Sequence, residues 1–404
     1  MIHRFSISNF QSIRDAVELD FRIPGTTPEV PCFRTSHSRP DVRLPSVIAL
    51  VGPNGSGKST LLRAIVETFR FIIYSYGYQS SHIRTFPSFL GPEALVSPTK
   101  IEIDFETLPQ KGHDDSASTL LRYTLELERD ETNLYATRVS REALYSFPKR
   151  RPRRLLEREK GQHIYVEKEI GLRPRDDRLS SIPENASAIS SLARMGVPFF
   201  VNLQEDISEA QTNIARIENS PRSSGAENIV DHYREQKDLT DKVSDKLQRF
   251  DLGIKDIKLQ SAQNGKWFLT FDHHGLNAPV MLQEESTGTR RLVHMYPSFN
   301  DALDSGHLAV MDSLDADFHT ELSMEVLNWF RKNETNPKKA QLICALHNVS
   351  VLNELEKEEI FIVEKDRSGA THAYGMRDIS GLRRGTNLQK QYRSGALGGL
   401  PAFG

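Results

Sequence analysis

The sequence predicts an α/β fold with a mixed central sheet, an antiparallel β subdomain and a helical insertion. After residue 307, apolar strand patterns alternate with helical ones, which implies a parallel sheet. Residues 101–106 and 121–129 instead alternate apolar and polar side chains, as antiparallel strands do. The segment 136–259 differs in character and contains a strongly basic stretch. We therefore expect three parts, which cover residues 1–135, 136–259 and 260–404.

The bulk composition is that of a globular protein. The chain has 404 residues, of which 38% are hydrophobic and 26% charged, and its formal net charge is −2. Such a balance does not indicate nucleic-acid binding by the whole molecule, so any such surface must be local. No segment has the apolar run of a signal peptide or membrane helix, so we expect a cytoplasmic protein without a membrane partner. Cys32 and Cys344 form no Cys-x-x-Cys pair, which argues against a disulfide framework or a zinc ribbon.

The order of the elements follows from hydrophobic periodicity. Apolar patterns predict two short strands around a turn within residues 1–22, a hairpin at 267–282, and single strands at 45–52, 307–312, 340–347 and 359–366. Helical spacing predicts helices at 60–76, 228–250 and 319–333. In the segment 228–250, Tyr233, Val243 and Leu247 share one face, so we expect an amphipathic helix that lies on the core.

The segment GPNGSGKST, residues 52–60, fits the pattern G-x-x-x-x-G-K-[ST]. It follows an apolar strand and opens a helix, which is the context that a phosphate cradle requires. Glycines let backbone N–H groups surround the phosphates, Lys58 reaches the β- and γ-phosphates, and the Ser59 hydroxyl ligates magnesium. The positive end of the following helix faces the anion. The segment therefore predicts a nucleotide site; the alternative is a glycine-rich turn with an accidental lysine.

Three later features are each weaker evidence for a nucleotide site than the segment 52–60. EESTGTRRL, residues 284–292, places Ser286 and Gly288 before a helix, where they would also suit an ordinary helix cap. An apolar strand at 308–311 runs directly into Asp312, and a further strand ends at His347. A lone histidine is usually structural or merely exposed. The order in which these features follow one another along the chain makes a functional interpretation of each more favourable.

In that order, the chain resembles the AAA-type ATPases related to the RecF, SMC and OLD proteins. The resemblance is carried by NF-x-S (9–12), GPNGSGKST, ESTGTRRL, SGHLAVMDSLDADFH, AQLICALHN and FIVEKDRSGA. It is greatest with a compact ATP-binding branch found in bacterial anti-phage systems, and it covers about 1–135 and 260–404. It implies an ABC/SMC-like P-loop ATPase head. In such proteins two ATP molecules are sandwiched between two heads, so the resemblance implies a homodimer or a higher oligomer.

The resemblance also implies roles for single residues. It assigns phosphate and magnesium binding to Asn54, Gly55, Ser56, Gly57, Lys58, Ser59 and Thr60. It places Ser286 and Gly288 against the ATP of the opposite subunit. Ser59 and Asp312 are the implied Mg²⁺ ligands, and His319 occupies the D-loop position. The implied catalytic set comprises Lys58, the Walker B acid Asp312, Ser313, Asp315 and the switch histidine His347.

Two positions depart from the family pattern. Ser313 stands where a catalytic glutamate usually follows the Walker B acid, and Asn348 replaces an aspartate. A serine cannot serve as a carboxylate base at neutral pH, and loss of a general base typically costs about 10²–10⁴ in rate. Asp315 would substitute only with a shifted geometry. We therefore expect ATP binding with slow hydrolysis.

The remaining inferences concern partners. The basic stretch Lys149–Lys160 is either a phosphate-backbone contact surface or an exposed hairpin whose arginine stems cover the sheet. The sequence contains no recognisable nuclease motif, so we expect a separately encoded effector, foremost a nuclease, controlled by an ATP-held dimer in anti-phage defence. The alternatives are a RecF-like DNA-binding ATPase and a small-molecule P-loop kinase, and the latter leaves ESTGTRRL and His347 unexplained.

Overall fold

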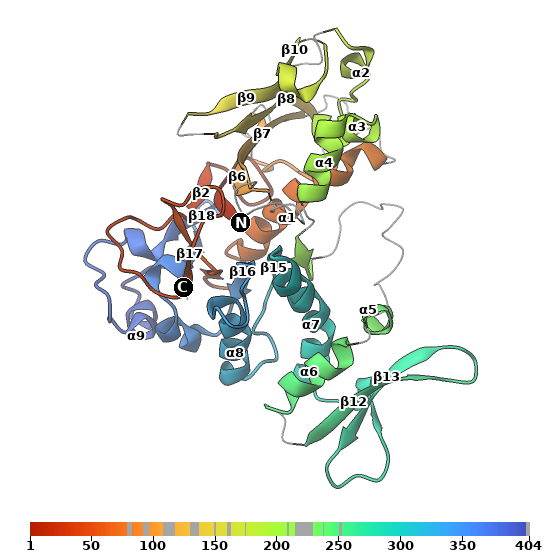
Figure 1. Cartoon of the computed structure of the whole chain (residues 1–404). Coiled ribbons are helices and arrows are strands. Elements are labelled where there is room, and N and C mark those ends of the chain that lie inside the picture. Colours follow the sequence, from red (N-terminus) through yellow and green to blue (C-terminus); the bar gives the residue numbers. More distant parts are fainter. Residues whose placement is uncertain are drawn as a thin grey trace.

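Two large sheets, a three-stranded sheet and a two-stranded sheet make up the β-structure of the described residues (Figure 1). The computed structural model describes residues 1–78, 83–91, 97–107, 118–129, 137–148, 151–159, 163–173, 175–207, 210–214, 229–236, 238–249 and 253–400. No helix in these ranges is both long and apolar enough to cross a bilayer.

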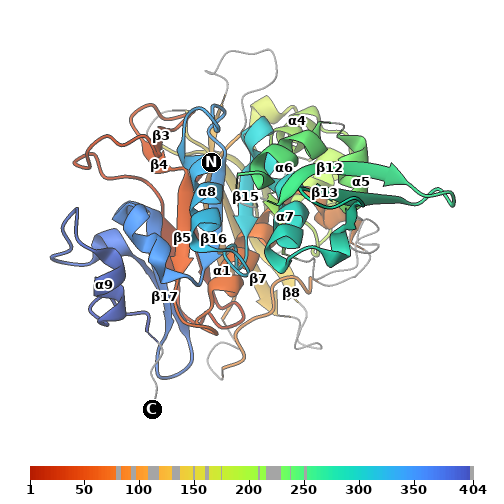
Figure 2. The same ribbon diagram turned by 90° about the horizontal axis from the view of Figure 1, so that it is seen from below.

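The six-stranded sheet positions the sequence motifs. Its order is β11 (Gln211–Thr212), β15 (Leu308–Met311), β16 (Gln341–Leu346), β5 (Val47–Val51), β17 (Ile360–Lys365) and β18 (Thr371–Gly375). The first five strands run parallel, and β18 is antiparallel to β17. Strands β15, β16 and β5 lie side by side at the centre of the view in Figure 2. Their carboxyl ends therefore meet at one edge of the sheet, which is where ligands bind in folds of this type.

The seven-stranded sheet is antiparallel throughout. Its order is β10 (His163–Val166), β9 (Arg153–Glu159), β8 (Thr137–Ser146), β7 (Leu120–Arg129), β6 (Thr99–Glu106), β1 (Ile2–Ser8) and β2 (Val17–Asp20). Buried and less buried residues alternate along β1 and β7, as expected when one face of an antiparallel sheet covers the core. Strands β7 and β8, which lie on either side of residue 135 in the sequence, pair in this one sheet. The expected boundary at residue 135 remains a proposal.

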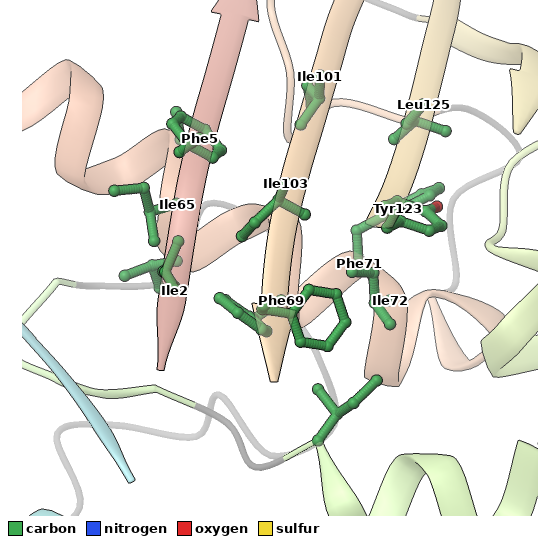
Figure 3. Packing of buried hydrophobic residues seen from close by; sticks show 14 of the residues in the cluster. Ile2, Phe5, Ile65, Phe69, Phe71, Ile72, Ile101, Ile103, Tyr123 and Leu125 are labelled. Carbon is green, nitrogen blue, oxygen red and sulfur yellow. The ribbon is translucent and has the colours of Figure 1, made fainter. Parts of the chain in front are cut away.

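Helix α1 (Lys58–Tyr74) lies between the two sheets and forms the main core with them. One of its faces packs on the antiparallel sheet, where Phe5, Ile103 and Tyr123 approach Ile65 and Phe71 (Figure 3). A second core covers the other face of the parallel strands and includes residues from α7 (Thr287–Ser305) and α8 (Thr320–Arg331). The P-loop helix is held between the two sheets by apolar side chains of the main core, whose removal from water is a principal source of stability.

A third sheet projects from the side of α6 and α7 (Figure 1). It consists of β12 (Ile254–Ser261), β13 (Trp267–His273) and β14 (Val280–Met281). Helices α5 (Ile229–Glu235) and α6 (Leu239–Leu247) lie against it. The remaining elements are short: β3 (Phe33–Thr35), β4 (Arg43–Pro45), α2 (Asp177–Ser180), α3 (Ala188–Arg194), α4 (Pro198–Asp206), α9 (Leu388–Arg393) and the 3₁₀ turns η1 (Ser75–Gly77), η4 (Lys168–Ile170), η5 (Leu282–Glu284), η6 (Val349–Glu354), η7 (Lys357–Glu359) and η8 (Met376–Asp378).

The predicted fold class is confirmed, with a mixed central sheet and a separate antiparallel sheet. One helix prediction is corrected. The expected continuous helix at 228–250 is divided into α5 and α6, and the division falls near Gln236 and Asp238. Its predicted contact with the core is confirmed, because Tyr233, Val243 and Leu247 are buried there. Strand β12, which pairs with the predicted hairpin, was not expected.

Candidate nucleotide site

The P-loop leaves strand β5 and ends in the first turn of α1. Gly55 and Gly57 have φ angles of 78° and 112°, which side chains other than glycine rarely adopt. A Cβ atom at Gly57 would also lie 2.3 Å from the Thr371 hydroxyl oxygen on β18. Glycine at this position therefore serves both the backbone conformation and the close approach of β18.

Lys58 lies folded inside its own loop. Its ammonium group donates to the carbonyl oxygens of Gly52, at 2.7 Å, and Pro53, at 3.0 Å. Burial lowers the pKa of this amine, while Asp312 and Asp315 oppose that shift by favouring the charged form. The electrostatic influence of both carboxylates indicates that the ends of β15 and of the P-loop converge at one place.

The loop also offers polar groups without an internal partner. The buried Ser56 hydroxyl has no hydrogen-bond partner. Helix α1 has Gly57 as its N-cap residue, with no side-chain cap and no acidic residue in its first turn. Unpaired N–H groups at a helix N-terminus attract anions. The residues of this cradle therefore fit a phosphate group.

A network of hydroxyl groups contacts the P-loop. Ser12, from the NF-x-S turn, lies 2.8 Å from the Thr371 hydroxyl and 3.4 Å from that of Thr60. Thr371 in turn donates to the Ser56 carbonyl at 2.9 Å. These contacts join the N-terminal turn, the P-loop and β18. The NF-x-S turn is thereby tied directly to the cradle.

A largely apolar pocket of about 580 Å³ adjoins this network. Its lining includes Gln11 and Ser12 from the N-terminal turn, Phe89 and Leu90, and Gly369 from the turn between β17 and β18. Ser12 therefore borders the pocket and also contacts the P-loop hydroxyl network.

Asp312 follows β15 and is held by Asn213, which follows the edge strand β11. The Asn213 side-chain carbonyl accepts from the Asp312 N–H at 2.8 Å, and its amide donates to the Asp312 carbonyl at 2.8 Å. The Asn213 side chain thus bonds to the backbone just beyond the last paired residues of β11 and β15, in the way that a neighbouring strand would. This contact fixes the backbone of Asp312 and leaves its carboxylate available to a ligand.

Ser313 adopts an unusual backbone conformation, with φ at 50°. Its hydroxyl lies 3.1 Å from Nε2 of the exposed His347 and 3.5 Å from an Asp312 carboxylate oxygen. Its carbonyl accepts from the Arg291 guanidinium on α7. The structure thus brings Ser313, Asp312 and His347 together, as the sequence predicted that they would be, although their catalytic roles remain predictions.

Asp315 is buried, and its carboxylate is occupied by backbone groups. It accepts from the His347 N–H at 2.9 and 3.0 Å and from the Asn348 N–H at 2.5 Å. These bonds argue against Asp315 as a substitute base, because a base must be free to accept a proton from water. The Asn348 side-chain oxygen accepts from the Ser350 N–H and so caps the following turn, and its amide donates to the Thr320 hydroxyl. Both residues therefore shape the segment that carries His347.

The signature segment lies at the N-terminus of α7. Ser286 caps this helix by accepting from the Thr289 N–H at 3.1 Å, as the ordinary-cap alternative predicts. Ser286 and Thr287 are nevertheless exposed, so their outer surface is available to another molecule. A Cβ atom at Gly288 would lie 2.9 Å from the Asp317 carbonyl oxygen, so glycine allows α7 to approach the loop after β15. His319, at the end of this loop, is exposed and pairs with Glu321.

The implied magnesium ligands are an exposed serine, Ser59, and a half-buried carboxylate, Asp312. Hydroxyl and carboxylate oxygens suit Mg²⁺, which usually takes few protein ligands and completes its shell with phosphate and water. In the described ranges, no cluster of three or more His, Cys, Asp or Glu residues forms a dedicated metal cage. The donors therefore fit a metal ion that is shared with a phosphate ligand.

The basic stretch is mostly engaged within the chain. Arg158 is buried and donates to Glu142 and to the Pro183 carbonyl, so its assignment to a phosphate-contact surface is wrong. Arg153 pairs with Glu167 and Glu169. Arg154 pairs with Glu157 and lies 3.9 Å from the centre of the Tyr165 ring. These contacts favour the hairpin alternative; Lys149, Arg150 and Lys160 lie outside the described residues.

Three residues at this site were missed by the sequence analysis, namely Asn213, Arg291 and Thr371. Asn213 follows a strand of only two residues, which carries no detectable periodicity. Arg291 belongs to the quoted signature segment, but nothing in its spacing showed which way it would point. Thr371 lies just beyond the FIVEKDRSGA motif, and only its close approach to Gly57 gives it a role.

The chain was compared with protein families, curated proteins and solved structures. Residues 47–353 match the family described as "AAA domain, putative AbiEii toxin, Type IV TA system". No curated protein matches significantly. Similar solved structures include an SMC head bound to the C-winged helix domain of ScpA (16% identity, 93% of this chain and 98% of that chain, TM-score 0.48).

Two further SMC heads are similar to the chain. One is the head domain from Thermotoga maritima, with 13% identity, 93% of this chain and 98% of that chain covered, and a TM-score of 0.43. The other, from Pyrococcus furiosus, has an extended coiled coil and is bound to the C-terminal domain of ScpA; it has 13% identity, 92% and 95% coverage, and a TM-score of 0.44. With scores below 0.5, these likenesses add nothing to the fold established by the strand order above.

Proposed function

Because this chain belongs to the family described as "AAA domain, putative AbiEii toxin, Type IV TA system", we propose that it dimerises around ATP and controls a separately encoded effector in anti-phage defence. Family membership bears out the AAA-type part of the resemblance found in the sequence. The finer proposal has four parts, which are ATP binding with magnesium, slow hydrolysis, ATP-dependent dimerisation and control of an effector.

The shape of the P-loop is the observation that carries the proposal. Its glycine conformations, the unpartnered Ser56 hydroxyl and the uncapped α1 N-terminus form a cradle for an anion. Lys58 would exchange its bonds to two loop carbonyls for phosphate oxygens. Ser59 and Asp312 would hold Mg²⁺, which supplies charge neutralisation on the phosphates. The apolar pocket beside Ser12 would receive the nucleobase.

Slow hydrolysis follows from Ser313. The hydroxyl lies within hydrogen-bond distance of His347, so it can orient the imidazole but cannot take a proton from water. The test is single-turnover hydrolysis of labelled ATP by wild type, Ser313→Glu and Ser313→Ala. We expect Ser313→Glu to raise the rate by about 10²–10⁴, and Ser313→Ala to remain slow. A wild-type rate equal to that of Ser313→Glu would contradict slow hydrolysis by this site.

The defence role rests on the family description and needs a cellular test. The gene is expressed together with its neighbouring genes in a phage-sensitive host, with Lys58→Ala and Lys100→Ala as the matched pair of variants. Lys100 is an exposed lysine that pairs with Glu126 on the antiparallel sheet. We expect protection from phage with wild type and Lys100→Ala, and none with Lys58→Ala. Equal plaque counts for all strains and an empty vector would contradict the role.

The RecF-like alternative has less support. It depends on a basic surface. In the described part of the stretch Lys149–Lys160, every arginine except Arg151 has an acidic partner among the described residues. ATP-dependent retention of duplex DNA on a filter discriminates the two proposals, since the effector proposal expects none.

A further inference from the structure

The Arg291 side chain on helix α7 contacts the loop that follows β15. Its Nη2 group donates to the carbonyl of Ser313, and its Nη1 group lies 3.9 Å from the Asp317 carboxylate. The side chain is only 25% exposed, and its Nε group is buried without a partner. Arg291 therefore connects the helix that begins with the signature segment to two points of the loop after β15.

Both ends of that connection are strained. Ser313 and Asp317 have φ angles of 50° and 66°, in the left-handed region that favours glycine. Non-glycine residues remain in such conformations only when surrounding contacts hold them. Arg291 supplies one such contact at each position. Gly288 supplies another, because it lets α7 approach the Asp317 carbonyl oxygen.

The same loop sets the geometry at the end of β15. The carbonyl that accepts from Arg291 belongs to the residue whose hydroxyl lies 3.1 Å from His347 Nε2. A rotation of the Ser313 peptide would therefore move its hydroxyl relative to the imidazole. Ser286 and Thr287 are exposed at the start of α7, only about one helical turn before Arg291. A rigid helix thus joins an exposed surface to the loop that orients Ser313.

We infer that Arg291 is a positioning residue that couples contact at a chain's signature segment to the alignment of Ser313 and His347 in the same chain. The inference rests on the proposed function, because the signature contact is made with ATP held by a partner. In the dimer, each signature segment would report engagement of the partner's ATP to its own chain's hydrolysis site. The contacts of Arg291 go to Ser313 and Asp317, so its removal should change the alignment and leave ATP binding intact.

The test compares Arg291→Gln and Arg291→Lys with the control Arg141→Gln. Arg141 is an exposed arginine on the antiparallel sheet that pairs with Glu157. We expect Arg291→Gln to lower kcat by about tenfold or more, since small misplacements can cost 10²-fold, with KM and ATP-dependent dimerisation unchanged. Lysine retains one charged donor but not the two-pronged guanidinium, so Arg291→Lys should recover part of the rate. An unchanged kcat, or an equal loss of ATP affinity, dimerisation and kcat, would overturn the inference.

A second readout separates this inference from the proposed function. Histidine-selective NMR of the nucleotide-free chain follows the His347 ring, assigned with His347→Gln. We expect Arg291→Gln to shift the His347 signals and Arg141→Gln to leave them in place. Unshifted signals in Arg291→Gln count against the inference even when the wild-type chain dimerises on ATP. Shifted signals in a chain that never dimerises count against the proposed function and leave the Arg291 contact established.

Discussion

The P-loop and the signature segment are both glycine-containing turns at the start of a helix, yet they are built differently. In the P-loop, Ser56 and Lys58 are buried, and Lys58 bonds to the loop's own carbonyls. In the signature segment, Ser286 already caps its helix, and its outer surface is exposed. One segment forms a cradle whose groups suit an anion, whereas the other has its helix cap already in place and an exposed outer surface. The difference indicates which half of a nucleotide site the chain completes alone and which half it offers to a second molecule.

Removal of the Lys58 amine should have the largest effect. We expect Lys58→Ala to reduce ATP turnover by about 10²–10³, because a preorganised charge that faces the phosphates is lost. Fluorescent-ATP binding should weaken in parallel. The control Lys100→Ala removes an exposed amine and should behave as wild type in both assays. If Lys58→Ala keeps its turnover, the cradle is not the hydrolysis site.

A methyl group at Gly57 tests how closely the cradle is fitted. Gly57→Ala combines a strained φ of 112° with a close approach to Thr371, so we expect roughly a 10- to 100-fold loss of ATP affinity. Gly55→Ala is the matched comparison, because Gly55 also has a positive φ but no atom within 4 Å of the added carbon. Isothermal titration should therefore show a much lower ATP affinity for Gly57→Ala than for Gly55→Ala. The reverse ranking would contradict the fitted cradle.

Two substitutions at Ser286 separate capping from contact with a partner. Aspartate caps a helix as well as serine does, so Ser286→Asp should keep the free energy of unfolding while its charge repels a partner's phosphates. Ser286→Ala should lose about 1 kcal/mol of stability. Urea unfolding and light scattering with ATP measure the two effects. We expect at least tenfold weaker ATP-dependent dimerisation in Ser286→Asp, and an undisturbed dimer would show that this surface is not used.

The smallest effect concerns pH. Burial lowers the pKa of Lys58 below 10.5, so this amine loses its charge at a lower pH than an exposed lysine. ATP affinity should therefore fall, by a few-fold, as pH rises through that lowered pKa. Folding stability should change in the opposite sense, because the penalty of burying the charged amine disappears as pH rises from the lowered pKa towards 10.5. Titrations of ATP affinity in wild type and Lys58→Ala check this assignment, since the variant should lack the alkaline decrease.

Much of this site could be predicted because its motifs are local. The P-loop, Asp312 and His347 each follow an apolar strand directly, so parallel pairing alone brings them to one edge. The contacts between elements could not be predicted. Asn213 contacts Asp312, which lies 99 positions later in the sequence, and Arg291 on α7 contacts Ser313 in the loop after β15. Arg158 belongs to a basic stretch, yet it is buried because Glu142 and two carbonyl groups receive its guanidinium.

The most direct test of the account joins the two unlike segments chemically. Asn54→Cys and Ser286→Cys are prepared as separate proteins, mixed, and treated with a short bismaleimide with and without ATP and Mg²⁺. The native thiols should react slowly, because Cys32 and Cys344 are buried and burial raises the pKa of each thiol, that of Cys32 to about 12. We predict a cross-linked pair of chains only in the mixture and only with ATP. A mixture that yields no such pair, or yields it equally without ATP, would contradict the claim that two chains enclose one nucleotide.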